Sequence, residues 1–142
     1  MKILLVVYDN DSYIHWFPQG IGYIASTLLE IGINVEIWNQ DFHHYSDEQL
    51  RLYLDNNNFD AICISIIAGY YQYQKIIALS SAVNRSKNRP VLILGGHGPS
   101  PEPEFFFKKT DADVIVIGEG EETSKELFNA IANKKPLSNI KG

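Results

Sequence analysis

The sequence predicts an α/β domain built on a parallel, doubly wound sheet of five strands with helices on both faces. Five short apolar runs, rich in β-branched residues, alternate with five segments of helical length along the 142 residues. Four of these runs are nearly continuous in Ile, Val and Leu, which is typical of strands covered on both sides. The connections between the runs and the helical segments are short, as in a series of βα units.

The first strand is expected at residues 2–8, where an apolar run ends before the polar residues Asp9, Asn10 and Asp11. Because no small-residue cleavage site follows this run, it is not a signal peptide. The other strands are expected at residues 34–38, 61–65, 91–94 and 114–117. For a chain of this length the most economical strand order is 2-1-3-4-5, the order of the flavodoxin-like fold.

The helices are expected at residues 18–31, 46–56, 70–86, 103–108 and 121–133. Gly32 is a suitable left-handed terminator of the first helix, and Ser46 with Gln49 predicts a capping box at the start of the second. Residues 1–135 are therefore expected to form one domain. Residues 136–142 are polar and begin with Pro136, which is typical of a linker that leaves a finished domain.

The composition excludes several classes of function. The 12 basic and 17 acidic residues give a net charge of −5, and no Lys/Arg cluster offers a surface for nucleic acid. The single cysteine, Cys63, excludes a disulfide framework, a four-cysteine zinc site and an iron–sulfur cluster ligated by this chain alone. No apolar stretch approaches the ~20 residues that span a bilayer. We therefore expect a soluble, cytoplasmic protein.

Ligands of open parallel sheets bind beyond the carboxyl ends of the strands, where the strand order reverses, here between the first and third strands. The loop after the fourth strand holds three glycines in four residues, Gly95, Gly96 and Gly98, around His97. Such a loop lets the backbone approach a ligand closely. The alternative is an ordinary tight turn between a strand and a helix.

The loop after the fifth strand repeats this theme with acidic residues, as Gly118-Glu119-Gly120-Glu121. Helix capping is the alternative here, because acidic side chains in a first turn complement the positive end of the helix dipole. The same negative charge makes this turn a poor cradle for a pyrophosphate.

The loop after the first strand lacks a G-x-G-x-x-G motif and a P-loop, and it carries Asp9 and Asp11. Both features disfavour a Rossmann nucleotide site and an NTPase. A response-regulator receiver domain is also excluded, because the third strand ends in Ser65 and not in a phosphate-accepting aspartate.

Two of the four histidines, His15 and His97, fall on loops at the expected ligand edge. There an imidazole could donate a hydrogen bond or coordinate a metal, and an exposed loop histidine without a role is the alternative. His43 and His44 are adjacent and their side chains diverge, so we do not expect both in one site.

Order and spacing make these motifs more specific together than singly. They are KILLV at residues 2–6, FPQGIGYIA at 17–25, FDAICIS at 59–65, LGGHGPS at 94–100, PE at 103–104 and IGEGEET at 117–123. In this arrangement the chain resembles the N-terminal cobalamin-binding domain of B12-dependent radical SAM enzymes, over almost its whole length.

The resemblance implies that a corrin ring lies across the carboxyl edge of the sheet. It also implies that the dimethylbenzimidazole tail is detached from cobalt and inserted beside the strands, the base-off state. The residues that would line or flank the tail are Ser65, Gly95, Gly96, His97, Gly98, Gly118, Glu119, Gly120 and Glu121. Glycines and a small serine leave space for a flat base and offer hydrogen bonds without bulk.

The sequence departs from the D-x-H-x-x-G cobalt-ligand motif of the methionine-synthase and mutase type. His15 precedes Gly20 by five positions, not three, and Tyr13 stands where the aspartate belongs. Asp41-Phe42-His43 echoes the motif but follows the second strand, away from the expected crevice. We expect no histidine ligand from this motif, and His15 or water is left as the cobalt-side candidate. In relatives the histidine of the fourth loop often stands one position later, at Gly98.

The resemblance further implies a C-terminal radical SAM domain beyond this chain, with a [4Fe–4S] cluster and S-adenosylmethionine, in many relatives a methyltransferase. Because the cluster needs three cysteines, this chain alone is not expected to catalyse that reaction. Two alternatives stay open: a flavodoxin-like protein-interaction domain, and a flavin or nucleotide binder without cobalamin. A bulky side chain filling the crevice under the glycine loop of residues 95–98 would favour the interaction domain.

Overall fold

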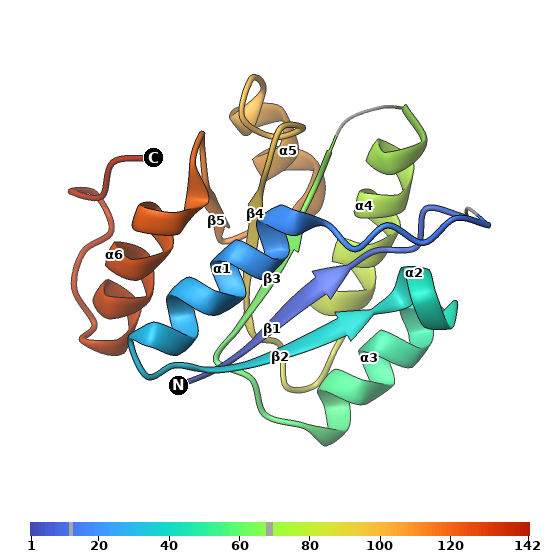
Figure 1. The fold of residues 1–142 in the computed structure, drawn as a ribbon, viewed down its shortest axis with the longest axis horizontal. Helices are drawn as coiled ribbons and strands as arrows, with labels where there is room; N and C mark the ends of the chain where they lie inside the picture. The colour runs from blue at the N-terminus through green and yellow to red at the C-terminus, as the bar shows by residue number, and fades with distance from the viewer. Residues whose placement is uncertain (12, 68–69) are drawn as a thin grey trace.

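The computed structural model describes residues 1–11, 13–67 and 70–142, so part of the expected ligand-edge loop at residues 66–69 lies outside the described residues. The strands are β1 (Lys2–Val7), β2 (Asn34–Asn39), β3 (Ala61–Ser65), β4 (Val91–Gly95) and β5 (Val114–Ile115). They form one sheet in the order β2-β1-β3-β4-β5, with every neighbouring pair parallel (Figure 1). The predicted fold class and strand order are confirmed.

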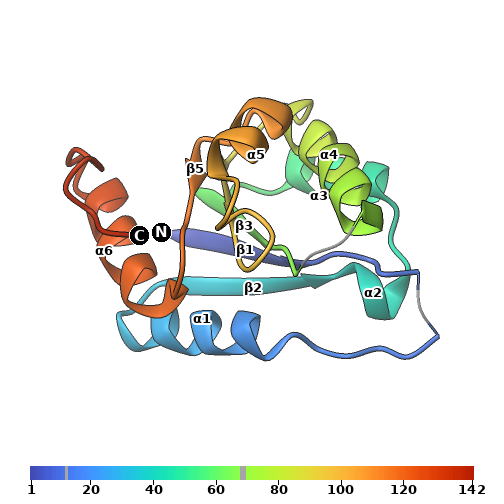
Figure 2. The ribbon, with the colours of Figure 1, turned by 90° about the horizontal axis from the view of Figure 1, so that it is seen from above.

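Helices cover both faces of this sheet (Figure 2). The helices are α1 (Gln19–Glu30), α2 (Gln40–His43), α3 (Asp47–Asn56), α4 (Tyr70–Asn84), α5 (Pro103–Thr110) and α6 (Gly120–Ala132). Helices α1 and α6 lie on one face, where Leu28 and Phe128 pack against the Leu5 side of β1. Helices α3, α4 and α5 lie on the other, where Leu54 and Ile76 pack against the Leu4 side. The strict alternation of β1 side chains between two apolar layers explains its continuous apolar run.

Two local predictions at helix ends are confirmed. The Ser46 hydroxyl accepts from the Gln49 backbone N–H at 3.2 Å, and the Gln49 side chain accepts from the Ser46 backbone N–H at 2.8 Å. Gly32 follows α1 with φ +78°, in the left-handed region. These contacts satisfy backbone groups that a helix end leaves without partners.

Some predicted bounds are wrong. Helix α2 was not expected: Asn39 caps it by accepting from the Phe42 backbone N–H at 3.0 Å. Strand β5 ends at Ile115 and not at residue 117, because only one further ladder bond, from Val116 N–H to Leu94 C=O at 2.8 Å, follows before the chain turns. Helix α5 continues two residues beyond the expected end, and the hydroxyl of its last residue, Thr110, donates to the Phe106 carbonyl.

The C-terminal segment returns along α6 (Figure 1). Ile140 packs on the apolar layer between the sheet and α6. The Thr123 hydroxyl lies 3.2 Å from the Lys141 carbonyl oxygen. That residues 136–142 begin a linker stays a prediction. Within the described residues, no helix has the length and apolar character that crossing a bilayer requires.

Candidate functional site

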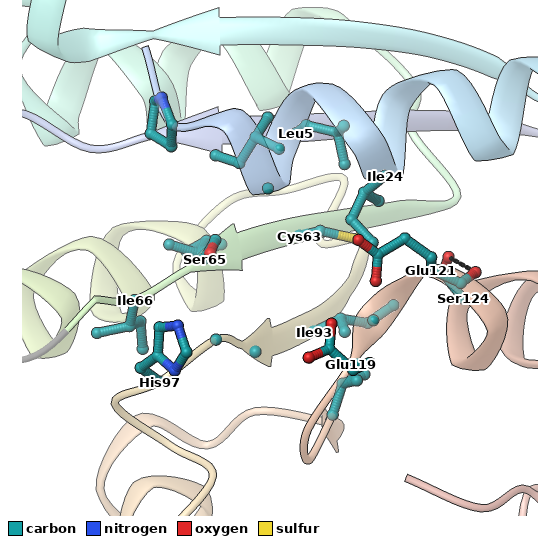
Figure 3. A pocket seen from close by; sticks show the side chains of 18 of the residues that line it. Leu5, Ile24, Cys63, Ser65, Ile66, Ile93, His97, Glu119, Glu121 and Ser124 are labelled. Carbon is teal, nitrogen blue, oxygen red and sulfur yellow. Dashed lines mark hydrogen bonds between the residues drawn. The ribbon is translucent and has the colours of Figure 1, made fainter. Parts of the chain in front are cut away.

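A cavity of about 670 Å³ opens at the carboxyl edge of the sheet, on the α1 and α6 face (Figure 3). This volume lies within the range of small-molecule sites. Its walls come from β1, β3 and β4, from the loops that follow β4 and β5, and from the N-terminal halves of α1 and α6 with the residues just after them. The cavity therefore lies where open parallel sheets bind their ligands.

The sheet contributes two rows of side chains to the cavity. In the deeper row Leu5 pairs with Cys63 and Cys63 with Ile93, across three neighbouring strands. Figure 3 shows Cys63 between the other two side chains. One step nearer the edge, Ser65 pairs with Gly95. Because this upper row consists of a serine side chain and a glycine, the sheet leaves room where the cavity opens.

Two helices form the other walls. Ile21 and Ile24 come from α1, and Leu127 and Phe128 come from the middle of α6. A Cβ at Gly120 would lie 3.0 Å from the Ile24 Cδ1 atom, so this glycine lets the start of α6 approach α1 closely. Sequence reasoning missed these helical residues. Their apolar spacing is that of any buried helix face, and only the fold brings the two faces together.

The β4 loop packs against the end of β3. Gly96 has φ +95°, and a Cβ there would lie 2.5 Å from the Ile66 carbonyl oxygen. A Cβ at Gly98 would lie 2.8 Å from Ile66 Cγ2. Gly96 lines the cavity, whereas Gly98 is outside the lining and packs on Ile66. Gly95 differs from both, because its Cβ would meet Val116 at an ordinary 3.5 Å.

Hydrogen bonds hold the loops in this position. The Gly98 backbone N–H donates to the Ile66 carbonyl at 3.0 Å. The Ser100 hydroxyl donates to the Gly96 carbonyl at 2.8 Å and accepts from the Gly118 backbone N–H at 3.1 Å. Ser100 thus joins the β4 loop to the β5 loop. It also lines the cavity, and nothing in the sequence separated it from the many serines that cap turns.

The charged groups of the lining are acidic. Glu119 and Glu121 reach the cavity from the start of α6, and His97 reaches it from the β4 loop (Figure 3). Among the described residues that line the cavity there is no Lys or Arg. The predicted residues Ser65, Gly118 and Gly120 also belong to the lining. The arrangement suits a ligand with apolar surface and hydrogen-bond donors better than a polyanion.

Burial raises the pKa of the Cys63 thiol to about 12, because the apolar surroundings disfavour the charged thiolate. The thiolate, which is the form that alkylates, is therefore disfavoured in the folded chain. We expect iodoacetamide to modify native Cys63 at least about a hundredfold more slowly than the same chain in urea. Mass spectrometry of timed samples measures both rates, and equal rates would contradict a raised pKa of this half-buried thiol.

His15 lies outside the cavity lining, beyond the end of β1. Its Nδ1 is 3.2 Å from the buried Asp41 carboxylate, which also accepts from the Asn10 backbone N–H at 2.9 Å. Asp41 lies outside the cavity lining, as expected from its place after the second strand, but it contacts the loop after β1. His44 pairs with Asp9 at 3.0 Å. A cobalt-side role for His15 stays a prediction.

His43 instead stacks on Tyr45, so the two adjacent histidines do face different partners. In the parts of the chain that the structure describes, no group of three or more His, Cys, Asp or Glu side chains is arranged to hold a metal ion.

The fold is shared with several cobalamin proteins of known structure. The radical S-adenosylmethionine methyltransferase TsrM from Kitasatospora setae, with cobalamin and a [4Fe-4S] cluster bound, superposes with a TM-score of 0.80 at 19% identity. The cobalamin-dependent radical enzyme OxsB, with aqua-cobalamin and S-adenosylmethionine bound, gives 0.77 at 20% identity. Each match covers 99% of this chain but only 26% and 20% of the TsrM and OxsB chains.

A cobalamin-binding protein from Desulfitobacterium hafniense DCB-2 gives a TM-score of 0.66 at 15% identity, over 88% of this chain and 57% of that one. No curated protein sequence matches this chain. The model of the B12 binding domain family matches residues 5–128, which include all the described residues that line the cavity. The chain therefore belongs to the B12-binding domain family.

Proposed function

We propose that this chain binds cobalamin base-off at the carboxyl edge of its sheet, as the cofactor module of a radical SAM enzyme. The observation that carries the proposal is the cavity under the small upper row, Ser65 and Gly95. It is deep, largely apolar and open at the edge, as a detached benzimidazole needs. The residues present therefore fit the nucleotide tail of this cofactor.

Apolar side chains and hydrogen-bonding groups of the chain would contribute to binding in different parts of the cavity. The deeper row of Leu5, Cys63 and Ile93 would contact the flat base, and removing the base from water favours binding. Ser65 and the backbone of Gly95 and Gly96 offer hydrogen bonds near the opening. When bound, cobalamin would supply a cobalt centre able to carry a methyl group, and this chain would hold and orient it.

The charge of the lining supports cobalamin over the alternatives. A flavin or dinucleotide site needs backbone N–H groups or cations to bind the phosphates of its ligand. Here the acidic side chains of Glu119 and Glu121 form the rim of the cavity instead. Cobalamin has one phosphodiester and many neutral amides, so the acidic rim opposes it less. An interaction domain without a ligand would fill its crevice, and here the space under Gly95 is open.

A larger parent enzyme is part of the proposal. The chain spans about a quarter or less of the TsrM and OxsB chains. It has one cysteine, so three cysteine ligands for a [4Fe–4S] cluster would have to come from another domain. We propose a C-terminal radical SAM domain that binds S-adenosylmethionine, with methyl transfer as the reaction type, in the cytoplasm.

Titration with hydroxocobalamin tests the binding proposal. The chain is mixed with cofactor, passed through a desalting column and examined by visible absorption. We expect cobalamin to co-elute with the protein and its spectrum to shift to that of the base-off form. Elution of free cofactor, with an unchanged spectrum at high micromolar concentrations of both, would overturn the proposal.

A further inference from the structure

The deepest part of the cavity is apolar. Its surface comes from the sheet row at Leu5 and Ile93 and from Leu127 and Phe128 on α6, all at most 4% exposed. Cys63 completes the row. The cause that keeps this thiol protonated is burial, so the floor carries no charge. The inner end of the cavity therefore offers contact to carbon atoms.

The charged side chains of the lining do not belong to this inner surface: Glu119 and Glu121 reach the cavity from the start of α6. The Ser124 hydroxyl donates to the Glu121 carbonyl at 2.9 Å, and Figure 3 shows this bond at the start of α6. Ser65 stands one step above the floor row. At the level of the floor the backbone of β3 pairs on both sides, with β1 and with β4. Among the described residues of the floor, the Cys63 thiol is the one polar side-chain group, and a thiol is a weak partner.

Cobamides differ in the base at the end of their nucleotide tail. Dimethylbenzimidazole presents methyl groups and carbon edges, and a phenolic base presents a methyl-substituted ring. Adenine presents an amino group with two donors and ring nitrogens that accept. Buried against this floor, those groups would lose their water and gain no partner, which typically weakens binding by about one to two orders of magnitude.

We infer that this chain is selective for cobamides with an apolar lower base, an inference that rests on the proposed function and extends it. The selectivity comes from the floor of the cavity, which consists of Leu5, Cys63, Ile93, Leu127 and Phe128. The floor distinguishes between lower bases because it offers no strong hydrogen-bond partner. Purine-containing cobamides are rejected because their polar edge finds no hydrogen-bond partner there.

The direct test compares p-cresolyl cobamide with adeninyl cobamide. A phenolic base does not coordinate cobalt and adenine coordinates weakly, so the comparison avoids the cost of detaching dimethylbenzimidazole from the metal. Dissociation constants come from titration of intrinsic Trp fluorescence or from calorimetry. We expect the cresolyl form to bind about 10- to 100-fold more tightly than the adeninyl form. Cobalamin should also bind more tightly than adeninyl cobamide, although it bears the detachment cost.

A matched pair of variants locates the selectivity. Cys63→Ser places a hydroxyl, a stronger donor and acceptor, on the floor, and we expect it to reduce the cresolyl-to-adeninyl ratio several-fold. Cys63→Ala removes the thiol without adding a polar group, and it should leave the ratio within about twofold of the wild-type value.

The outcomes separate the inference from the proposed function. Equal affinity for the cresolyl and adeninyl forms, with tight binding of both, would overturn the inference and leave cobalamin binding intact. Cobinamide, which lacks the nucleotide, binding as tightly as cobalamin would also overturn it, because the cavity would then hold no base. Failure of every cobamide to bind would instead overturn the proposed function itself.

Discussion

Replacing Gly95 by leucine is expected to weaken cobalamin binding by at least about a hundredfold while leaving the fold intact. The Cβ would point to the cavity face of β4 and meet Val116 at 3.5 Å, an ordinary contact. The rest of the leucine side chain would then occupy the opening beside Ser65. Forcing atoms into a filled site typically costs about 1–3 kcal/mol, and exclusion of the base costs its whole burial in addition.

A graded series makes this result specific. Gly95→Ala adds one methyl group and should weaken cobalamin binding less than Gly95→Leu does. Both variants should unfold within a few degrees of the wild type, since neither needs a left-handed backbone at this position. Titration gives the affinities and thermal melts give the stabilities. Wild-type affinity in the folded leucine variant would mean that the ligand does not enter beside Gly95.

Replacing Gly96 by alanine is expected to destabilise the fold by about 3 kcal/mol, at the upper end of the cost of local backbone strain. Gly96 has φ +95°, which L residues rarely adopt, and the new Cβ would lie 2.5 Å from the Ile66 carbonyl oxygen. Because that neighbour is backbone, no side-chain rotation relieves the overlap. We expect a lower urea midpoint with an unchanged slope, which indicates a change in stability alone.

Gly118→Ala is the matched control for this experiment. Gly118 also has a positive φ, +78°, but nothing lies within 4 Å of its Cβ position. It should cost about 1 kcal/mol, from the left-handed backbone alone. If Gly96→Ala and Gly118→Ala shift the urea midpoint equally, the close packing of the β4 loop on Ile66 does not exist in solution.

The sheet could be predicted because each strand is recognisable from its own short apolar run. β3 has the predicted bounds, since the apolar run begins directly after Asp60 and Ser65 is its first polar residue. Helix α2 could not be predicted, because its four residues include no apolar repeat and its cap depends on Asn39 continuing β2. The early end of β5 depends on how far its backbone stays paired with β4, and this pairing is a tertiary property.

The candidate site could be predicted in part for the same reason. Its loop residues, such as Ser65, Gly95 and Gly118, follow strands and therefore gather at one edge of a parallel sheet. Leu127 and Phe128 lie within a helix, and which strands they face is set by packing. The Asp41–His15 contact joins segments that follow different strands, so no spacing in the sequence predicts it.

The most direct measurement of the central claim, that the chain binds cobalamin base-off, is the electron paramagnetic resonance spectrum of cob(II)alamin bound to ¹⁵N-labelled chain. We predict that the ¹⁴N triplet of the coordinated benzimidazole disappears on binding, because the base leaves cobalt for the floor at Cys63. A ¹⁵N doublet in its place would identify a protein ligand such as His15 and agree with the detached tail. Persistence of the ¹⁴N triplet in the protein-bound cofactor would show the base still on cobalt and contradict the account.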